Sequence, residues 1–288
     1  MQYALVFFST VLLAFTFAVQ KKYQAVEGAG TTAGLRYNAL SGLIMAVLCF
    51  AFNGFALQFS AFSVIFAFST ALLCVCYSLI GFYILRFSGM AIYSIFLMIG
   101  GMLLPYIYGV LFLNEVLSPF RIIGVILIVV AVVFSNKAKY ATKAWLYLLC
   151  TAVFILNGFV SILSKCHQIN TTYAAVDSVT FAMYMGLGQF LFGSCALLLG
   201  KEKKKALALP SGTVWLMIAG SAVLSGTSYI LQLIGAKGLP ATVLYPMVTG
   251  GSIILSSLSG AVFFKEKLSV YQIASVVLCF VGTLLFLF

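Results

Sequence analysis

Long apolar runs separated by short polar stretches follow one another along the whole chain. A helix that crosses a bilayer needs about 20 consecutive, mostly apolar residues. Runs of about this length predict ten spanning helices, at roughly 3–20, 31–52, 61–85, 90–113, 119–135, 143–164, 177–199, 213–235, 240–264 and 269–288. The two-residue alternation of outer-membrane strands is absent. The pattern therefore predicts an all-α polytopic membrane protein.

The composition supports this interpretation. Hydrophobic residues make up 64% of the chain and charged residues 7%, whereas a soluble domain carries about 25% charged residues. The seven cysteines lie inside apolar runs, which argues against a secreted disulfide scaffold. The first run has no basic segment before it and no evident small-residue cleavage site, which argues against a removable signal peptide. The bilayer is therefore the expected solvent.

The two halves of the chain resemble each other. A shift of 151 residues aligns residues 111–118 with residues 262–269 without a gap, and Glu115 meets Glu266. The same shift aligns Gly100 with Gly251. We therefore expect a duplication, with a first five-helix repeat at 1–137 and a second at 138–288.

An odd number of helices in each half makes the second half run through the membrane upside down. This is the inverted-repeat plan of many secondary transporters, whose solute site lies near the bilayer midplane between the repeats. Two similar halves of opposite orientation can exchange shapes and expose such a site to each side in turn. The sequence thus predicts alternating access through a central cavity.

Several short motifs are similar to those of the EamA-like branch of the drug/metabolite transporter superfamily. They are the Arg36-Tyr37 pair, the Tyr245-Pro246 pair, and a Glu after the fourth and ninth runs followed by a run with Gly or Ser. The chain departs from that family in lacking a Trp-Gly pair in its first run. The resemblance implies a central cavity built from the first, third, fourth, sixth, eighth and ninth runs.

Polar side chains recur at helical spacing on several of these runs. Residues i, i+4 and i+7 share one helix face, and polar groups are costly where they face lipid. The candidate substrate-binding residues on these faces are Tyr77, Tyr108, Asn157, Ser228, Gln232, Tyr245, Thr249 and Ser252. For the serines, close helix packing is an equally good interpretation.

Glycines and prolines in the fourth and ninth runs are candidates for gating or hinge positions. Proline removes a backbone donor and kinks a helix, whereas small residues also serve tight helix contacts. The candidates are Gly100, Gly101, Pro105, Pro246, Gly250 and Gly251.

The few charged residues lie near the ends of the runs. Glu115 and Glu266 precede the fifth and tenth runs, where a structural capping role on the next helix is expected. Arg36, Arg86 and Lys237 are either interfacial anchors or groups that attract an anion to a cavity mouth.

The sole histidine, His167, follows the sixth run and is expected to be solvated in a loop. A phosphate-binding loop, a Ser-His-Asp set and a metal-ligand cluster are not evident, so we expect no enzyme activity, cofactor, metal site or nucleic-acid partner.

The distribution of basic residues bears on orientation. The connections after the odd-numbered runs, with Arg36 and Lys143 at the starts of the following runs counted in, hold 13 of the 16 Lys and Arg residues. The positive-inside rule therefore predicts that both termini lie outside. The family resemblance instead implies cytoplasmic termini. The expected location is the cell membrane of a bacterium.

The leading hypothesis is a secondary transporter of a small polar or amphipathic metabolite. An amino acid or its derivative, a nucleoside and a choline-like amine all suit the predicted cavity. The sequence leaves open whether an ion or a proton is coupled to transport. The alternative is a non-transporting membrane module that handles lipid or assists assembly. A transporter needs a solute-sized polar cavity, whereas in a packing module neighbouring helices fill the polar faces.

Overall fold

The computed structural model describes residues 2–28, 30–85, 90–135, 144–200, 210–263 and 269–287. Within these ranges the chain forms ten α-helices and no strand, which confirms the predicted all-α class. The helices are α1 (Gln2–Glu27), α2 (Thr31–Phe52), α3 (Ala61–Leu85), α4 (Met90–Phe112), α5 (Pro119–Ser135), α6 (Ala144–Ile169), α7 (Ser178–Leu199), α9 (Gly212–Gly238), α10 (Ala241–Phe263) and α11 (Val270–Leu284), and a 3₁₀ turn, η1 (Leu285–Leu287), follows α11.

Eight of the described helices are long and apolar enough to cross a membrane, while α5 and α11 are shorter apolar helices. The outer surface of the bundle is apolar as well. Phe8, Ile65 and Leu216 are 61%, 63% and 76% exposed. Such exposure suits contact with lipid chains, so the chain has the character of an integral membrane protein.

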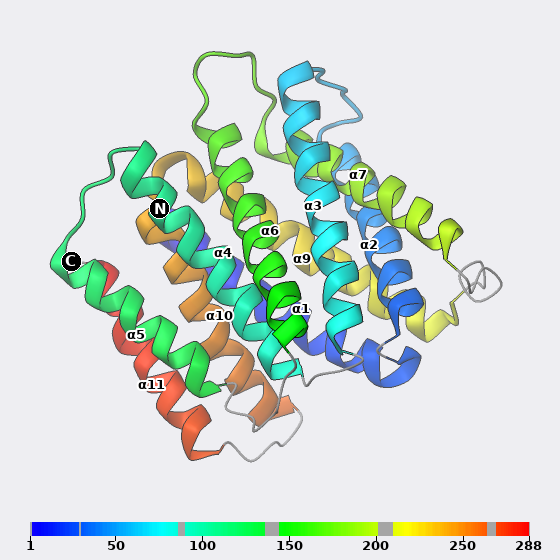
Figure 1. Ribbon diagram of the computed structural model, residues 1–288. Helices are drawn as coiled ribbons and strands as arrows, with labels where there is room; N and C mark the ends of the chain where they lie inside the picture. Colours follow the sequence, from blue (N-terminus) through cyan, green and yellow to red (C-terminus); the bar gives the residue numbers. More distant parts are fainter. Residues whose placement is uncertain are drawn as a thin grey trace.

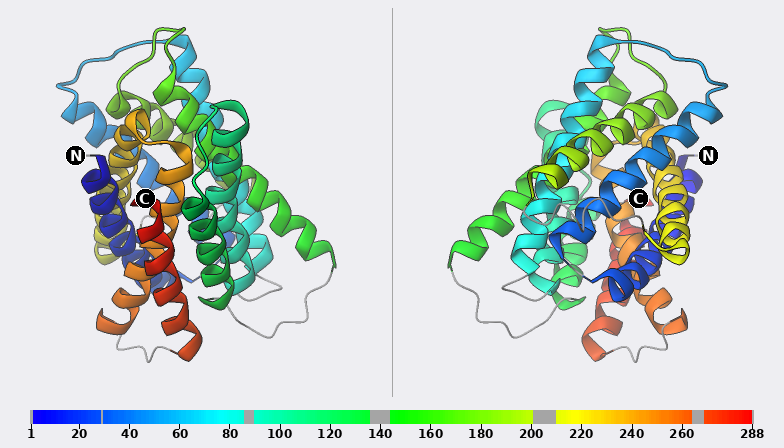
Figure 2. Two further views of the ribbon diagram at one scale, coloured as in Figure 1. Left: turned by 90° about the vertical axis from the view of Figure 1, so that its left-hand side faces the viewer. Right: turned by 90° about the vertical axis from the view of Figure 1, so that its right-hand side faces the viewer.

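The helices pack in a pattern that joins the two halves of the chain (Figures 1 and 2). Helix α2 packs on α7, α4 on α10, and α5 on α11. Helix α1 packs on α9 and α10, and α6 packs on α3 and α4. The predicted boundary between the repeats, at 137/138, lies outside the described residues.

Small residues set the closest of these contacts. A Cβ atom added to Gly42 of α2 would lie 2.7 Å from the backbone oxygen of Gly186 of α7. Gly124 of α5 stands in the same relation to Gly282 of α11, at 2.9 Å. Because helix association in lipid depends on close packing, these glycines hold the two halves together.

Two buried apolar clusters flank the middle of the bundle. One joins α2, α3 and α7 around Phe181 and Ala71. The other joins α4, α5, α10 and α11 around Met102 and Ile128. The central cavity described below lies where helices of both clusters meet α1, α6 and α9.

Two helices extend well beyond the apolar runs that predict them. Helix α1 continues through the polar segment 20–27, and α6 continues to Ile169. Tyr23 in the added part of α1 is buried and donates a hydrogen bond to the backbone oxygen of Ala33, at 2.8 Å. Tertiary contacts therefore stabilise helical turns that hydropathy alone does not predict.

Candidate solute cavity

A cavity of about 380 Å³ lies inside the bundle and is lined by residues of α1, α2, α3, α4, α6, α7, α9 and α10. Its size falls within the range of small-molecule sites. Seven of the predicted substrate-binding residues line it, namely Tyr77, Asn157, Ser228, Gln232, Tyr245, Thr249 and Ser252.

Tyr108 is the predicted binding residue that the structure places elsewhere. Its hydroxyl oxygen accepts a hydrogen bond from the Cys166 thiol at 3.2 Å, and its ring stacks on Phe112. Tyr108 is not among the residues that line the cavity. Helical spacing alone does not separate a cavity residue from one a turn further along the same helix face.

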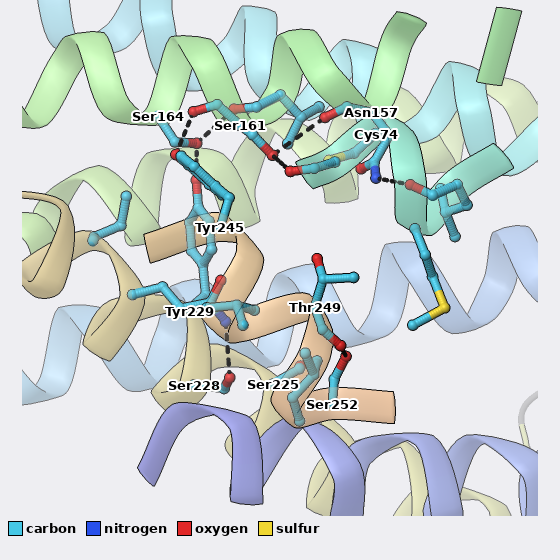
Figure 3. A pocket seen from close by; sticks show the side chains of 18 of the residues that line it. Cys74, Asn157, Ser161, Ser164, Ser225, Ser228, Tyr229, Tyr245, Thr249 and Ser252 are labelled. Carbon is cyan, nitrogen blue, oxygen red and sulfur yellow. Dashed lines mark hydrogen bonds between the residues drawn. The ribbon is translucent and has the colours of Figure 1, made fainter. Parts of the chain in front are cut away.

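Two tyrosines cross the cavity wall to α6 (Figure 3). The Tyr245 hydroxyl donates to the backbone oxygen of Ser161 at 2.6 Å. The Tyr229 and Ser164 hydroxyls lie 2.8 Å apart. Both tyrosines thus place a ring at the cavity and fix α9 and α10 against α6.

Where α4 meets α6, a side chain of α6 supplies the hydrogen bond that a proline removes from a backbone carbonyl of α4. Because Pro105 has no N–H, the carbonyl of Gly101 lacks its usual helical partner. The Ser161 hydroxyl donates to that carbonyl at 3.2 Å. Next to it, the Asn157 amide donates to the backbone oxygen of Leu97 at 2.7 Å.

Serines of α9 and α10 form the opposite wall. Ser228 donates to the backbone oxygen of Ser9 at 2.7 Å, and the Gln232 amide donates to the Ser228 hydroxyl at 3.2 Å. Ser252 donates to the carbonyl of Thr249, one helical turn back, at 2.8 Å. The wall is therefore polar and internally hydrogen-bonded.

The structure adds lining residues that the sequence analysis missed. Helices α2 and α7 contribute Met45, Met185 and Gln189, and α1 contributes Leu13 and Phe17. Gln189 had a signal, since a Gln in the middle of an apolar run needs a polar neighbour. The other residues gave no such signal, because the sequence does not distinguish an apolar side chain at a cavity from one in the core.

A second cavity of about 490 Å³ adjoins the first and shares Phe17, Tyr77 and Leu97 with it. It lies at the end of the bundle where α1 ends and α2 begins, between residues such as Gln24 and Asn38. We call this end of the bundle the α1–α2 end. The two cavities together lead from the middle of the bundle toward the α1–α2 end.

At the opposite end, which holds the turn between α9 and α10, two charged side chains bridge the helix ends. The Glu115 carboxylate accepts hydrogen bonds from the N–H groups of Ala241 and Thr242 at 2.7 and 2.8 Å. The Lys165 ammonium donates to the carbonyls of Ala236 and Leu239 at 2.7 and 2.6 Å. We call this end of the bundle the α9–α10 end.

The predicted capping role of Glu115 needs a correction. The expected helix was α5, which follows Glu115 in sequence, but the carboxylate caps α10 instead. The backbone turns at Asn114, whose φ is +52°, and this turn lets the next side chain reach across the bundle. Glu266, its counterpart in the second half, lies outside the described residues.

The charged residues do not form one cationic mouth. Arg36 is buried near the α1–α2 end and pairs with Glu27. Lys237 is exposed in the last turn of α9, at the α9–α10 end. Arg86 lies outside the described residues. Attraction of an anion by these groups stays a prediction.

The expectation that His167 is solvated in a loop is wrong. It lies in the last turn of α6 and is 1% exposed. Gln168 donates to its Nδ1 at 3.0 Å, and Ser63 lies 2.8 Å from its Nε2. Its ring stacks on Phe181, with 4.0 Å between centroids. The imidazole thus ties α6 to α3 and α7. Across the described ranges, no three His, Cys, Asp or Glu side chains gather as metal ligands.

The candidate hinge glycines lie at close contacts. A Cβ atom on Gly100 would lie 2.3 Å from the Phe154 carbonyl oxygen, and one on Gly250 would lie 2.4 Å from the Thr283 methyl group. Gly101 and Gly251 face Asn157 and Thr10 in the same way, and Pro105 and Pro246 lie inside α4 and α10. Close packing is therefore a sufficient reason for glycine at these four positions. Hinge motion stays a prediction.

Comparison with known proteins bears on the fold. No protein-family model matches the chain, and no curated protein matches it. Chains of solved structures do match, 29 in number. One of them, described only as the crystal structure of a protein, superposes with a TM-score of 0.79 over 98% of this chain and 94% of that chain. At 17% sequence identity this similarity shows that the two chains share a fold.

Proposed function

We propose that the chain is a secondary transporter of a small polar or amphipathic metabolite, which works by alternating access between two inverted five-helix repeats. An amino acid or derivative, a nucleoside or an amine fits this class. The motifs around Arg36 and Tyr245 support a place in the EamA-like branch of the drug/metabolite transporter superfamily. The observation that carries the proposal is the polar central cavity between the two halves.

The helix contacts support the duplication. In the proposed duplication the counterparts are α1 and α6, α2 and α7, α3 and α9, α4 and α10, and α5 and α11. When each helix is replaced by its counterpart, the α1–α9 contact becomes the α6–α3 contact, and the α4–α6 contact becomes the α10–α1 contact. All four contacts are present. The same exchange leaves α2–α7, α4–α10 and α5–α11 unchanged. Such self-paired contacts are expected on a twofold axis between the repeats.

Individual contacts between α5 and α11 support the inversion. Gly124 packs on Gly282, and Ser275 donates to the backbone oxygen of Ala131 at 2.7 Å. The shift of 151 residues exchanges these two contacts, since it pairs Gly124 with Ser275 and Ala131 with Gly282. The numbering rises along α5 as it falls along α11, so the paired helices are antiparallel. A twofold axis between antiparallel helices lies across the bundle rather than along it.

The two ends of the cavity support transport over the non-transporting alternative. Glu115 and Lys165 bridge the helices at the α9–α10 end, which we take as the closed end, whereas the second cavity continues to the α1–α2 end. An arrangement with one closed end and one cavity-lined end suits one state of an alternating cycle. If the odd-numbered connections are cytoplasmic, as their charge predicts, the termini lie outside and the cavity faces inward.

Uptake by the purified protein in proteoliposomes, measured against a panel of labelled metabolites, tests the proposal. We expect at least one solute of the proposed class to accumulate. Tyr77→Ala, Asn157→Ala, Gln232→Ala and Tyr245→Ala should each lower uptake while the protein stays in the membrane. Tyr147→Ala, at an exposed position of α6, is the control and should leave uptake unchanged. Uptake at the unsubstituted level in all four variants contradicts the cavity assignment.

A further inference from the structure

We infer that the central cavity admits a small organic amine in its protonated form, which donates its N–H groups to a wall of oxygen acceptors and tyrosine rings. This inference rests on the proposed function and narrows its solute class. It comes from an account of where the hydrogens of the wall are already used.

Most hydroxyl hydrogens of the wall are already donated to the protein backbone. A hydroxyl has one hydrogen, so a hydroxyl that donates to a carbonyl offers only lone pairs to other groups. Ser228, Ser252 and Tyr245 each donate to a backbone oxygen, at 2.7, 2.8 and 2.6 Å. Toward a solute these three residues are acceptors.

The same account holds where two side chains share a hydrogen bond. Ser164 lies 2.8 Å from the carbonyl of Val160, which takes its hydrogen. The 2.8 Å contact between Ser164 and Tyr229 therefore uses the hydrogen of Tyr229, whose oxygen is left as an acceptor. The amide nitrogens of Asn157 and Gln232 each donate one of their two hydrogens within the wall. Each residue therefore offers a solute its carbonyl oxygen and one remaining N–H group.

The wall offers more acceptors than donors and carries no formal charge. Among the described residues that line the cavity, none is charged. Tyr77, Gln189 and Thr249 are the hydroxyl or amide residues of this wall for which no donation to a protein oxygen is found. A carboxylate or phosphate needs several donors or a cation, because burial without them costs several kcal/mol. The wall is thus poorly suited to an anion.

Acceptor oxygens and aromatic faces share a preference for positive charge. Tyr77, Tyr229 and Tyr245 bring three rings to the cavity, and the negative face of an aromatic ring attracts an ammonium group. Apolar residues such as Leu13 and Met98 supply the surface for an apolar body. A protonated primary amine on such a body satisfies both parts of the wall.

Four probes that share one phenyl body test the inference by binding to the purified protein. They are 2-phenylethylamine, its N,N,N-trimethyl derivative, 2-phenylethanol and 3-phenylpropionate. We expect the primary amine to bind at least about tenfold more tightly than the carboxylate, because its charged N–H groups meet acceptor oxygens, whereas the carboxylate would face mostly acceptors. The trimethyl derivative should bind more weakly than the primary amine because it has no N–H. Equal binding of all four, tightest binding of the carboxylate, or no binding of any probe overturns the inference.

A charge added to the wall gives a second, independent test. Gln189→Glu should strengthen binding of 2-phenylethylamine about tenfold and weaken binding of 3-phenylpropionate. The control is Gln272→Glu, which adds the same charge outside the cavity and keeps the capping box of α11, because Glu serves there as well as Gln. The control should change neither affinity. Unchanged affinity for both probes in Gln189→Glu would count against the inference.

The two proposals fail in distinguishable ways. Amine-selective binding without uptake of any solute into proteoliposomes would leave the cavity assignment standing and remove the transport function. Uptake of solutes by a cavity that prefers the carboxylate probe would leave transport standing and remove the amine class.

Discussion

At the scale of single residues, the structure separates side chains that shape the cavity from side chains that fix helix ends. Asn157 and Tyr245 do both, since each borders the cavity and bonds to a backbone carbonyl of a neighbouring helix. Asp177 does only the second. Its carboxylate accepts hydrogen bonds from the N–H groups of Val179 and Thr180, at 2.7 and 3.1 Å, and so caps α7.

Asp177 makes stability depend on pH. Burial raises the pKa of its carboxyl, but hydrogen bonds from Thr180 and Val179 outweigh this and lower the pKa below the ordinary 3.8. A carboxyl with a lowered pKa stabilises the folded state above its unfolded pKa, about 3.9, and this contribution is lost as pH falls through the folded pKa. Asp177→Asn keeps an N-cap residue and should remove this dependence.

The measurement is the difference in thermal midpoint between the wild type and Asp177→Asn from pH 8 down to pH 3. We expect a constant difference down to about pH 5 and a relative loss for the wild type below that. A difference that stays the same over the whole range is inconsistent with the assigned role.

Sequence reasoning at this scale located cavity positions where the signal was local, and their role in binding stays a prediction. Seven of the eight predicted binding residues line the cavity because polar residues on apolar helices turn inward. It failed for His167, whose burial depends on Ser63, Gln168 and Phe181. Ser63 and Phe181 belong to other helices, and no local pattern indicates such partners.

At the scale of elements, glycine contacts set the distance between helices. Gly100→Ala should destabilise the protein by about 1–3 kcal/mol, because the new Cβ would lie 2.3 Å from the Phe154 carbonyl oxygen, which belongs to a helix backbone. Gly220→Ala is the control, since no atom lies within 4 Å of its Cβ position. There the change should stabilise α9 by about 0.5–1 kcal/mol through helix propensity. Chemical unfolding in detergent measures both, and shifts of the same sign would contradict the contact.

The first turn of α10 depends on a residue of another element. Glu115→Gln removes the charge that accepts from the Ala241 and Thr242 N–H groups, at a cost of about 1–2 kcal/mol. Amide hydrogen exchange should become faster in the first turn of α10. Asp177→Asn, which removes one negative charge from a different helix start, should leave that turn unchanged. Unaltered exchange in Glu115→Gln would show that the carboxylate does not hold the α9–α10 end closed.

The helices themselves could be predicted from hydropathy, because each is marked by an apolar run, although α5 and α11 are shorter than the other eight. The partner of Glu115 could not, since Ala241 lies 126 positions away along the chain. The extension of α1 to Glu27 was missed for a related reason. Its polar turns border the second cavity rather than lipid, so they carry no apolar signal.

At the scale of the whole molecule, the account has two similar halves packed around a cavity that is closed at one end. The α5–α11 and α2–α7 contacts join the halves through small residues. Glu115 and Lys165 bridge the helices at the end that the proposal takes as closed. In the proposed cycle, that end opens while the α1–α2 end closes.

Cysteine accessibility tests the proposed cycle most directly and needs no known solute. Ser225→Cys places a thiol in the cavity wall after the seven native cysteines are replaced. A control thiol, Tyr173→Cys, sits on the exposed loop before α7 and should react from one side of sealed vesicles only. The account predicts that a membrane-impermeant reagent labels Ser225→Cys from either side, at different rates. Labelling from one side only, or from neither, would contradict alternating access.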